Sequence, residues 1–141
     1  MTQDLQSVLP IGIDEVDAEH ALQFKLLEGF DLAVEEGDRE SALQFLTRLY
    51  DFSDAHFGSE QVLMRFHSYP GYAAHEREHG ELLAELWKMS ELIRHSPSAE
   101  MPVRSVEIRR WLLAHINSSD RAFASYLRRE SPGSVAAPRP S

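Results

Sequence analysis

Residues 75–93 read HEREHGELLAELWKMSELI, and they carry the strongest helical pattern in the chain. Two histidines and four apolar residues recur along this stretch at spacings of four, three, four, three and four. Residues at such spacings share one face of an α-helix. The residues on this face are His75, His79, Leu82, Leu86, Met89 and Ile93. We predict an amphipathic helix that begins near Tyr72 and ends at the break HSPSAEMP (95–102).

Three further segments show helical periodicity. The first begins at Asp17, a suitable N-cap, and closes at Gly37; the second begins near Asp38 and ends before SYPG (68–71); the last runs from about Val103 to Arg129. Their predicted inward faces carry, in chain order, His20, Phe24, Leu27 and Val34, then Leu46, Leu49, Ser53, His56, Glu60 and Leu63, then Ile108, Leu112, His115 and Ser119. Four amphipathic helices with short connections predict an all-α fold, an antiparallel up-down-up-down four-helix bundle.

The chain length of 141 residues is that of one domain. Pro10 and Gly12 disfavour a helix near the start, so we expect an irregular N-terminal arm over residues 1–16. The bundle is expected over residues 17–130. The remaining residues, 131–141, are rich in proline, serine and alanine and predict a disordered tail.

Composition narrows the classes of partner. A formal net charge of -9 argues against nucleic acid and anionic membranes, which both require clustered lysine and arginine. No apolar run approaches the roughly 18 residues of a membrane span, and no secretory leader is visible. The absence of cysteine excludes disulfides and thiolate metal sites and fits the cytoplasm, where we expect the protein. The sequence indicates no protein partner, and a monomer is compatible with it.

Seven polar residues fall on the predicted inward faces, or close to them, near the middle of the bundle. They are His20, His56, Glu60, His75, His79, His115 and Asp120. Buried polar groups are costly unless something binds them together, and metal ions do so. Seven ligands are too many for one tetrahedral zinc and suit two metals with bridging carboxylates. Imidazole and carboxylate ligands suit iron, manganese and zinc, so the ligand set alone does not identify the metal.

His115 and Asp120 are five residues apart, which is about 140° around an ideal α-helix. For both to reach one site, the helix must turn unevenly, as in a π-bulge, or the aspartate must reach across. The sequence leaves this choice open.

The letters HEREH (75–79) also match the H-E-x-x-H motif of zinc metalloproteases. That interpretation leaves five of the seven residues unexplained, and no predicted strand could seat a peptide. Glu76 lies beside His75, about 100° from the inner face, and is expected to point outward. We therefore interpret the stretch as two metal ligands that enclose a solvated charged triplet.

At these residues the sequence resembles the hemerythrin family, specifically its bacterial hemerythrin-like domains. The family pattern H…HxxxE…HxxxH…HxxxxD is filled by His20, His56 and Glu60, His75 and His79, and His115 and Asp120. The surrounding stretches also match: GIDEVDAEH (12–20), HFGSEQVLM (56–64), YPGYAAHEREH (69–79) and WLLAHINSSD (111–120). The resemblance spans about residues 10–130.

The resemblance implies two iron ions in an oxo- or hydroxo-bridged, non-haem di-iron centre that binds O2 reversibly, and no enzymatic activity. By this analogy one iron is held by three histidines, His75, His79 and His115. The other is held by His20 and His56 and keeps an open position for O2, while Glu60 and Asp120 bridge the two. Three further residues resemble the family's apolar O2 pocket, although core packing alone would also explain them: Trp111, Leu112 and Ile116.

Three positions depart from what many relatives carry. Leu5 stands in place of tryptophan, Glu19 in place of glutamine and Gln61 in place of glutamate. None of the three is expected to touch a ligand, although Glu19 could alter the hydrogen bonding behind the site. The remaining histidines, His67 and His95, are expected at the surface.

Two alternative functions stay open. Hemerythrin-like domains can act as O2 or redox sensors, although nothing in this chain resembles an output domain. A ferritin-like oxidase or peroxidase would use two Glu-x-x-His motifs, and this chain has one, from Glu76 to His79.

Overall fold

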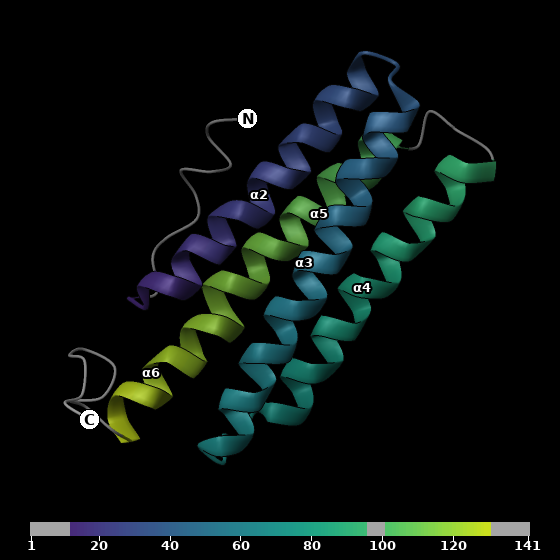
Figure 1. Cartoon of the computed structure of the whole chain (residues 1–141). Helices are drawn as coiled ribbons and strands as arrows, with labels where there is room; N and C mark the ends of the chain where they lie inside the picture. The colour runs from purple at the N-terminus through teal and green to yellow at the C-terminus, as the bar shows by residue number, and fades with distance from the viewer. Residues whose placement is uncertain (1–11, 96–100, 131–141) are drawn as a thin grey trace.

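The computed structural model of the chain describes residues 12–95 and 101–130, and within these ranges the protein is helical, without strands. The elements are α2 (Asp14–Glu35), α3 (Arg39–Phe66), α4 (Tyr72–His95), α5 (Met101–His115), the π-helix η1 (Ile116–Asp120) and α6 (Arg121–Glu130). Because α5, η1 and α6 follow one another without a break, they form a single rod (Figure 1). The prediction of an all-α four-helix bundle is confirmed.

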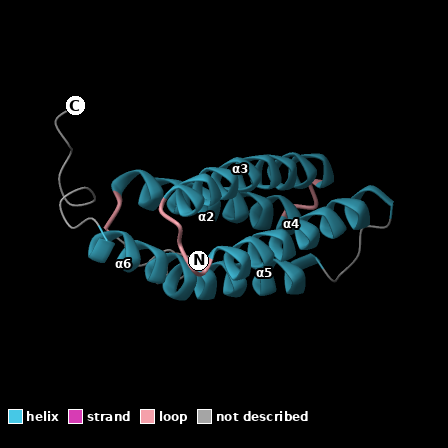
Figure 2. Ribbon diagram, turned by 90° about the horizontal axis from the view of Figure 1, so that it is seen from below, coloured by secondary structure: helices cyan, strands magenta, loops and turns pink. Residues whose placement is uncertain are grey.

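The four rods are antiparallel. α2 and α4 run in one direction, and α3 and the α5–η1–α6 rod run in the other (Figure 1). Seen after a turn of 90°, all rods lie roughly along one axis, with the turns after α2 and α3 at opposite ends of the bundle (Figure 2). Side chains from the middle of each rod therefore meet in one interior, at matching heights along the bundle axis.

The start of the first helix differs from the prediction. α2 begins at Asp14, and its N-cap is Ile13, whose side chain makes no capping hydrogen bond. Asp17, the predicted N-cap, lies one turn inside the helix instead, where a negative charge stabilises the helix dipole. Its Oδ2 accepts a hydrogen bond from the backbone N–H of Gly12 at 3.3 Å. The acidic first turn thus replaces the expected cap.

The other predicted boundaries agree closely with the structure. Gly37 has a positive φ of 70° and closes the turn after α2, a conformation that glycine adopts without strain. Asp38 is the N-cap of α3, and its side chain accepts from the backbone N–H of Ser41 at 3.0 Å. α4 begins at Tyr72, as predicted. The predicted tail and most of the predicted arm lie outside the described residues.

Two apolar clusters occupy the interior of the bundle, on either side of the seven polar residues along the bundle axis. The larger contains Phe24, Leu27, Phe30, Leu46, Leu49, Leu82, Leu86, Met89 and Leu112, among others. The smaller contains Met64, Phe123 and Leu127. The prediction that Leu63 faces inward is wrong, because Leu63 is 45% exposed while Met64 is fully buried. Met64 lies four residues after Glu60, and there it meets α6.

One buried ion pair ties the first rod to the last. Arg109 of α5 donates to Asp31 of α2, and the Ser105 hydroxyl donates to the other oxygen of the same carboxylate. Both partners of the Asp31 carboxylate are themselves buried. Replacing such a pair by apolar residues is often neutral for stability, whereas removing one partner is strongly destabilising. Among the described helices, none has the length and apolarity needed to cross a bilayer.

Candidate metal centre

All seven predicted ligands are buried and converge at the middle of the bundle. They form two groups, and within each group the possible ligand atoms all lie within 4.8 Å of one another. One group is Glu60, His75, His79, His115 and Asp120; the other is His20, His56, Glu60 and Asp120. Glu60 and Asp120 belong to both groups. The structure therefore has three imidazoles on one side of a shared carboxylate pair and two on the other.

The three-histidine group draws on α4, the end of α5, and both carboxylates. His75 Nε2 lies 2.7 Å from Asp120 Oδ1, and His115 Nε2 lies 3.1 Å from the same oxygen. His79 Nε2 lies 3.2 Å from Glu60 Oε1 and 3.2 Å from His115 Nε2. All three rings thus direct Nε2 toward a common point.

The two-histidine group joins α2 and α3. His20 Nε2 lies 3.0 Å from Asp120 Oδ2, and His56 Nε2 lies 3.2 Å from Glu60 Oε2. Each carboxylate therefore turns one oxygen toward each group: Oδ1 and Oε1 toward three histidines, Oδ2 and Oε2 toward two. This is the arrangement that two bridging carboxylates require.

A π-helix brings the last two ligands together. His115 ends α5, and η1 spans the five residues Ile116–Asp120. A π-helical segment turns less per residue than an α-helix, so residues five apart come onto one face. His115 Nε2 and Asp120 Oδ1 then lie 3.1 Å apart. The structure thus decides the question that the sequence left open, in favour of the π-bulge.

The donor set fits metal ions. Among the described residues, five buried atoms of the ligand side chains have no hydrogen-bond partner: Nδ1 and Nε2 of His20, Nε2 of His56, Glu60 Oε1 and Asp120 Oδ2. Leaving a buried polar atom unpaired costs about 1–3 kcal/mol. Coordination to cations would satisfy four of these atoms, all except His20 Nδ1, and would offset the charges of both carboxylates.

Comparison with known proteins agrees with this geometry. Residues 11–127 match the family model of the hemerythrin HHE cation binding domain. The chain is 27% identical to a bacteriohemerythrin of Stenotrophomonas maltophilia over 87% of its own length and 80% of that protein. It is also 27% identical to a bacteriohemerythrin of Methylococcus capsulatus, over 79% of its length and 85% of the relative.

The chain belongs to the hemerythrin family. Domains of this family bind a di-iron centre, and the buried histidine and carboxylate cluster of this hemerythrin domain could hold one.

Three ligand rings of this hemerythrin domain are oriented from behind by hydrogen bonds. Nδ1 of His56 donates to Glu19, Nδ1 of His79 donates to Gln61 at 2.9 Å, and Nδ1 of His115 donates to Glu78 at 2.7 Å. Because these carboxylate and amide oxygens only accept, each ring carries its proton on Nδ1. Such a hydrogen bond leaves the Nε2 atom as the one that would coordinate a metal ion.

These contacts correct two expectations. Glu19 and Gln61 were not expected to touch a ligand, yet each accepts a hydrogen bond from a ligand ring. Glu78 was expected to be part of a solvated triplet, but it is half-buried and also accepts from the Ser119 hydroxyl at 2.8 Å. Glu78 lies three residues after His75, on the flank of α4 that faces the last rod. Glu76 is exposed, as expected.

The titration of the metal-free cluster reflects competition between burial and charge. Burial lowers the pKa of His56, but contacts with Glu60 and Glu19 outweigh it and raise the pKa to about 9. Burial lowers the pKa of His79, and here the Glu60 contact does not compensate. For Asp120 burial would raise the pKa, but hydrogen bonds from His115 and its other histidine neighbours hold it well below the usual range.

Apolar and aromatic side chains enclose the three-histidine group. Trp111 stacks on His115 with ring centroids 4.9 Å apart, and Phe57 stacks on His79 at 3.8 Å. Leu112 and Ile116 are fully buried in the larger apolar cluster. Phe57 of α3 stacks on His79 of α4, whereas Trp111 and His115 belong to the same helix, and the sequence pattern did not single out Phe57. Only the packing of α3 on α4 reveals the contact.

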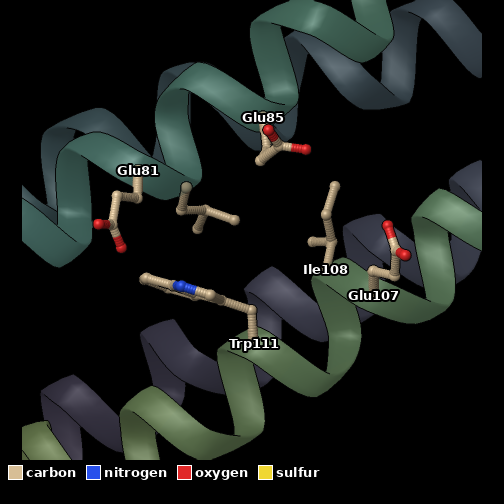
Figure 3. A pocket seen from close by; sticks show the side chains of 6 residues that line it. Glu81, Glu85, Glu107, Ile108 and Trp111 are labelled. Atoms are coloured by element: carbon tan, nitrogen blue, oxygen red, sulfur yellow. The ribbon is translucent and has the colours of Figure 1, made fainter.

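A surface hollow lies on the outer side of Trp111. It has a volume of about 270 Å³ and is lined by Leu82, Ile108 and Trp111, with Glu81, Glu85 and Glu107 at its edge. Figure 3 shows Trp111 and Ile108 on α5 facing α4 across this hollow. Because Trp111 also stacks on His115, a single indole separates the hollow from a predicted ligand.

A second cavity, of about 320 Å³, reaches both shared carboxylates from the α6 end of the bundle. Glu60, Asp120 and Glu19 line it, together with apolar residues of α2, α3 and α6. Glu19 thus has one oxygen on His56 and an exposed carboxylate at the cavity wall. This cavity reaches ligand residues directly, whereas Trp111 separates the surface hollow from His115.

Both histidines outside the pattern lie away from the cluster. His95 is exposed, and His67 is half-buried at the opposite end of α3 from the Asp38 cap. His67 pairs with Glu130 of α6 at 3.0 Å. Neither belongs to a group of possible ligands among the described residues.

Proposed function

We propose that this domain binds O2 reversibly at a di-iron centre. The observation that carries the proposal is the unequal division of imidazoles around two shared carboxylates. His75, His79 and His115 would hold one iron, His20 and His56 the other, and Glu60 and Asp120 would bridge them. The two-histidine iron has one protein donor fewer, and an open position of this kind distinguishes a ligand-binding site from a closed structural one.

The surroundings support a carrier. When bound, the iron pair supplies reversible coordination of O2 and the electrons that the bound ligand draws on. The protein's part is to fix the rings through their Nδ1 hydrogen bonds and to exclude water with Trp111, Leu112 and Phe57. The relatives are named bacteriohemerythrins, which favours the same function.

An oxidase or peroxidase is the alternative of a different class. Enzymes of the ferritin-like kind use a carboxylate-rich set with two Glu-x-x-His motifs. Here five imidazoles outnumber two carboxylates, and Glu76, the glutamate of the one such motif, is exposed rather than directed at the cluster. The ligand set therefore favours binding of O2 without turnover.

The deciding experiment loads the protein with iron under anaerobic conditions and measures iron content and the visible spectrum. We expect about two irons per chain and an absorption band that appears with O2 and disappears when O2 is removed, over repeated cycles. Continuous O2 consumption in the presence of a reductant, or a colourless protein with a single zinc, would contradict the proposal.

A further inference from the structure

One buried polar pair in the bundle is not explained by the metal ligands. Gln23 of α2 donates from Nε2 to the Ser53 hydroxyl of α3 at 3.0 Å, and both residues are 0% exposed. Among the described residues, Gln23 Oε1 has no hydrogen-bond partner. Apart from atoms of the ligand residues, it is the only unpartnered buried side-chain atom found there. An amide in an apolar layer is costly to keep, so its location is informative.

The pair lies one helical turn from the two-histidine group. Gln23 follows His20 by three residues and Ser53 precedes His56 by three, which is a rise of about 4.5 Å on each helix. Because α2 and α3 are antiparallel, both displacements are in the same direction along the bundle axis (Figure 1). The amide and hydroxyl therefore lie directly beside the two rings that leave a position open.

The same layer contains the aromatic and apolar side chains of the last rod. Leu112 precedes His115 by three residues and Trp111 precedes it by four, and α5 runs in the same direction as α3 (Figure 1). Gln23 and Ser53 are thus level with these two residues along the bundle axis. Glu60 and Asp120, by contrast, line the cavity on the opposite side. This layer is apolar apart from Gln23 and Ser53, and the Gln23 amide has one hydrogen-bonding atom without a partner among the described residues.

We propose that Gln23 makes a direct hydrogen bond to a small polar ligand held at the two-histidine site, and that Ser53 orients the amide. The ligand class is a diatomic or triatomic molecule or anion with a polar outer atom, such as O2 or azide. This inference rests on the proposed function for O2, but it extends to any exogenous ligand of the open position.

The Ser53 hydroxyl makes the amide adaptable. A hydroxyl can both donate and accept, so the amide of Gln23 can rotate and exchange the roles of Oε1 and Nε2 without losing its bond to Ser53. The amide then offers an N–H to a ligand that only accepts, and an oxygen to a ligand that carries a proton. Leucine or methionine at this position could do neither.

The test replaces both partners by apolar groups of similar size, in the double variant Gln23→Met with Ser53→Ala. Removing both partners together leaves no new unpaired group and is nearly neutral or stabilising for a pair with no further role. We expect the metal-free variant to melt at the same or a higher temperature. The iron-loaded variant should keep its iron content while azide binding to the oxidised protein weakens by about threefold to tenfold, the effect of one neutral hydrogen bond. The rate of O2 release should rise by a similar factor.

Leu27→Met is the matched control. Leu27 is fully buried on the same face of α2, one turn farther from His20 than Gln23. It should change neither azide affinity nor O2 release. Unchanged azide affinity and O2 release in the double variant, within twofold, would overturn the inference, as would a lower melting temperature without a ligand effect. That second result would mean that the amide has a structural partner such as a buried water.

The azide measurement separates this inference from the proposed function. It uses the oxidised iron protein and requires no reversible O2 adduct. If the native protein fails to bind O2 reversibly but azide affinity still depends on Gln23, the proposed function fails and the inference stands.

Discussion

The two halves of the metal cluster share both carboxylates but differ in the number of imidazoles and in the side chains around them. The half formed by His75, His79 and His115 has three imidazoles, and aromatic rings stack on two of them. The half formed by His20 and His56 has two imidazoles, and one turn away lies the Gln23 amide, whose Oε1 has no hydrogen-bond partner among the described residues. Under the proposed function, the first half would act as a closed structural site and the second would admit a ligand. The two halves differ by one histidine ligand.

Loss of a shared carboxylate should have the largest effect, because it removes an oxygen from both halves at once. We expect Glu60→Ala to reduce iron content from about two per chain to below one, as measured by metal analysis after anaerobic loading. Glu76→Gln is the control, because Glu76 is exposed and outside the cluster, and it should load normally. Full loading of Glu60→Ala would mean that the carboxylate does not bridge.

Removing one imidazole from the open half should affect that half alone. We expect His56→Ala to retain roughly one iron per chain, held by His75, His79 and His115, and to lose the O2-dependent band. Circular dichroism should show an intact helical fold. An unchanged O2 adduct in this variant would refute the assignment of the open half.

Removal of metal tests whether the cluster is a cross-link between the rods. Ions that bind only the folded chain stabilise it by about 4 kcal/mol at a thousandfold excess over Kd, so we expect the metal-free protein to melt roughly 10–20 °C lower. Differential scanning calorimetry of both forms measures this. Equal melting temperatures would show that the polar core is satisfied without metal.

The pH dependence of the metal-free protein follows from His56. Its pKa is raised to about 9, above the value of about 6.5 in an unfolded chain, so its stabilising contribution is fully present below pH 6.5 and is lost as the pH rises through 9. Stability of the metal-free form to urea should therefore fall over this window. Metal binding must displace the same proton, so the gap between metal-loaded and metal-free stability should widen from pH 6.5 to 9. A gap that narrows would contradict this assignment.

The smallest effect is expected from the groups behind the rings. Glu19→Gln and Glu78→Gln each replace an anionic acceptor by a neutral one, on opposite halves of the centre. Loss of such a partner commonly lowers metal affinity by about 10–100-fold, and an amide that still accepts should give the lower end or less. Glu19→Gln should weaken the second iron and Glu78→Gln the first, measured by competition with a chelator. Identical effects on both irons would mean that the halves are not independent.

Most of the fold could be predicted because each helix has its own apolar stripe and its own boundary signals. Gly37, Asp38 and the turn before Tyr72 mark three boundaries with residues of local effect. The start of α2 was misplaced because acidic residues favour the first turn of a helix as well as its cap, and Asp14 and Asp17 are both available. Leu63 was wrongly placed on the inward face because Met64, the next residue, is also apolar. The packing of α3 against α6 buries Met64 and leaves Leu63 exposed.

The seven residues of the cluster could be singled out because their spacing within each helix is a local property. The hydrogen-bond partners behind the rings could not be singled out, because they lie on other helices. Glu78 of α4 contacts His115 of α5, and Glu19 of α2 contacts His56 of α3. The pairing of Gln23 with Ser53 depends likewise on the height at which two antiparallel helices align. No periodicity within one helix encodes that height.

The amino-acid sequence by itself determined the helices, their inward faces and the residue types that meet at the centre, because period and charge act along the chain. Only the tertiary structure decided that two carboxylates are shared, that a π-helix brings Asp120 beside His115, and that a cavity reaches both carboxylates. Those features arise from contacts between residues far apart in the chain, and the packing of four rods sets them.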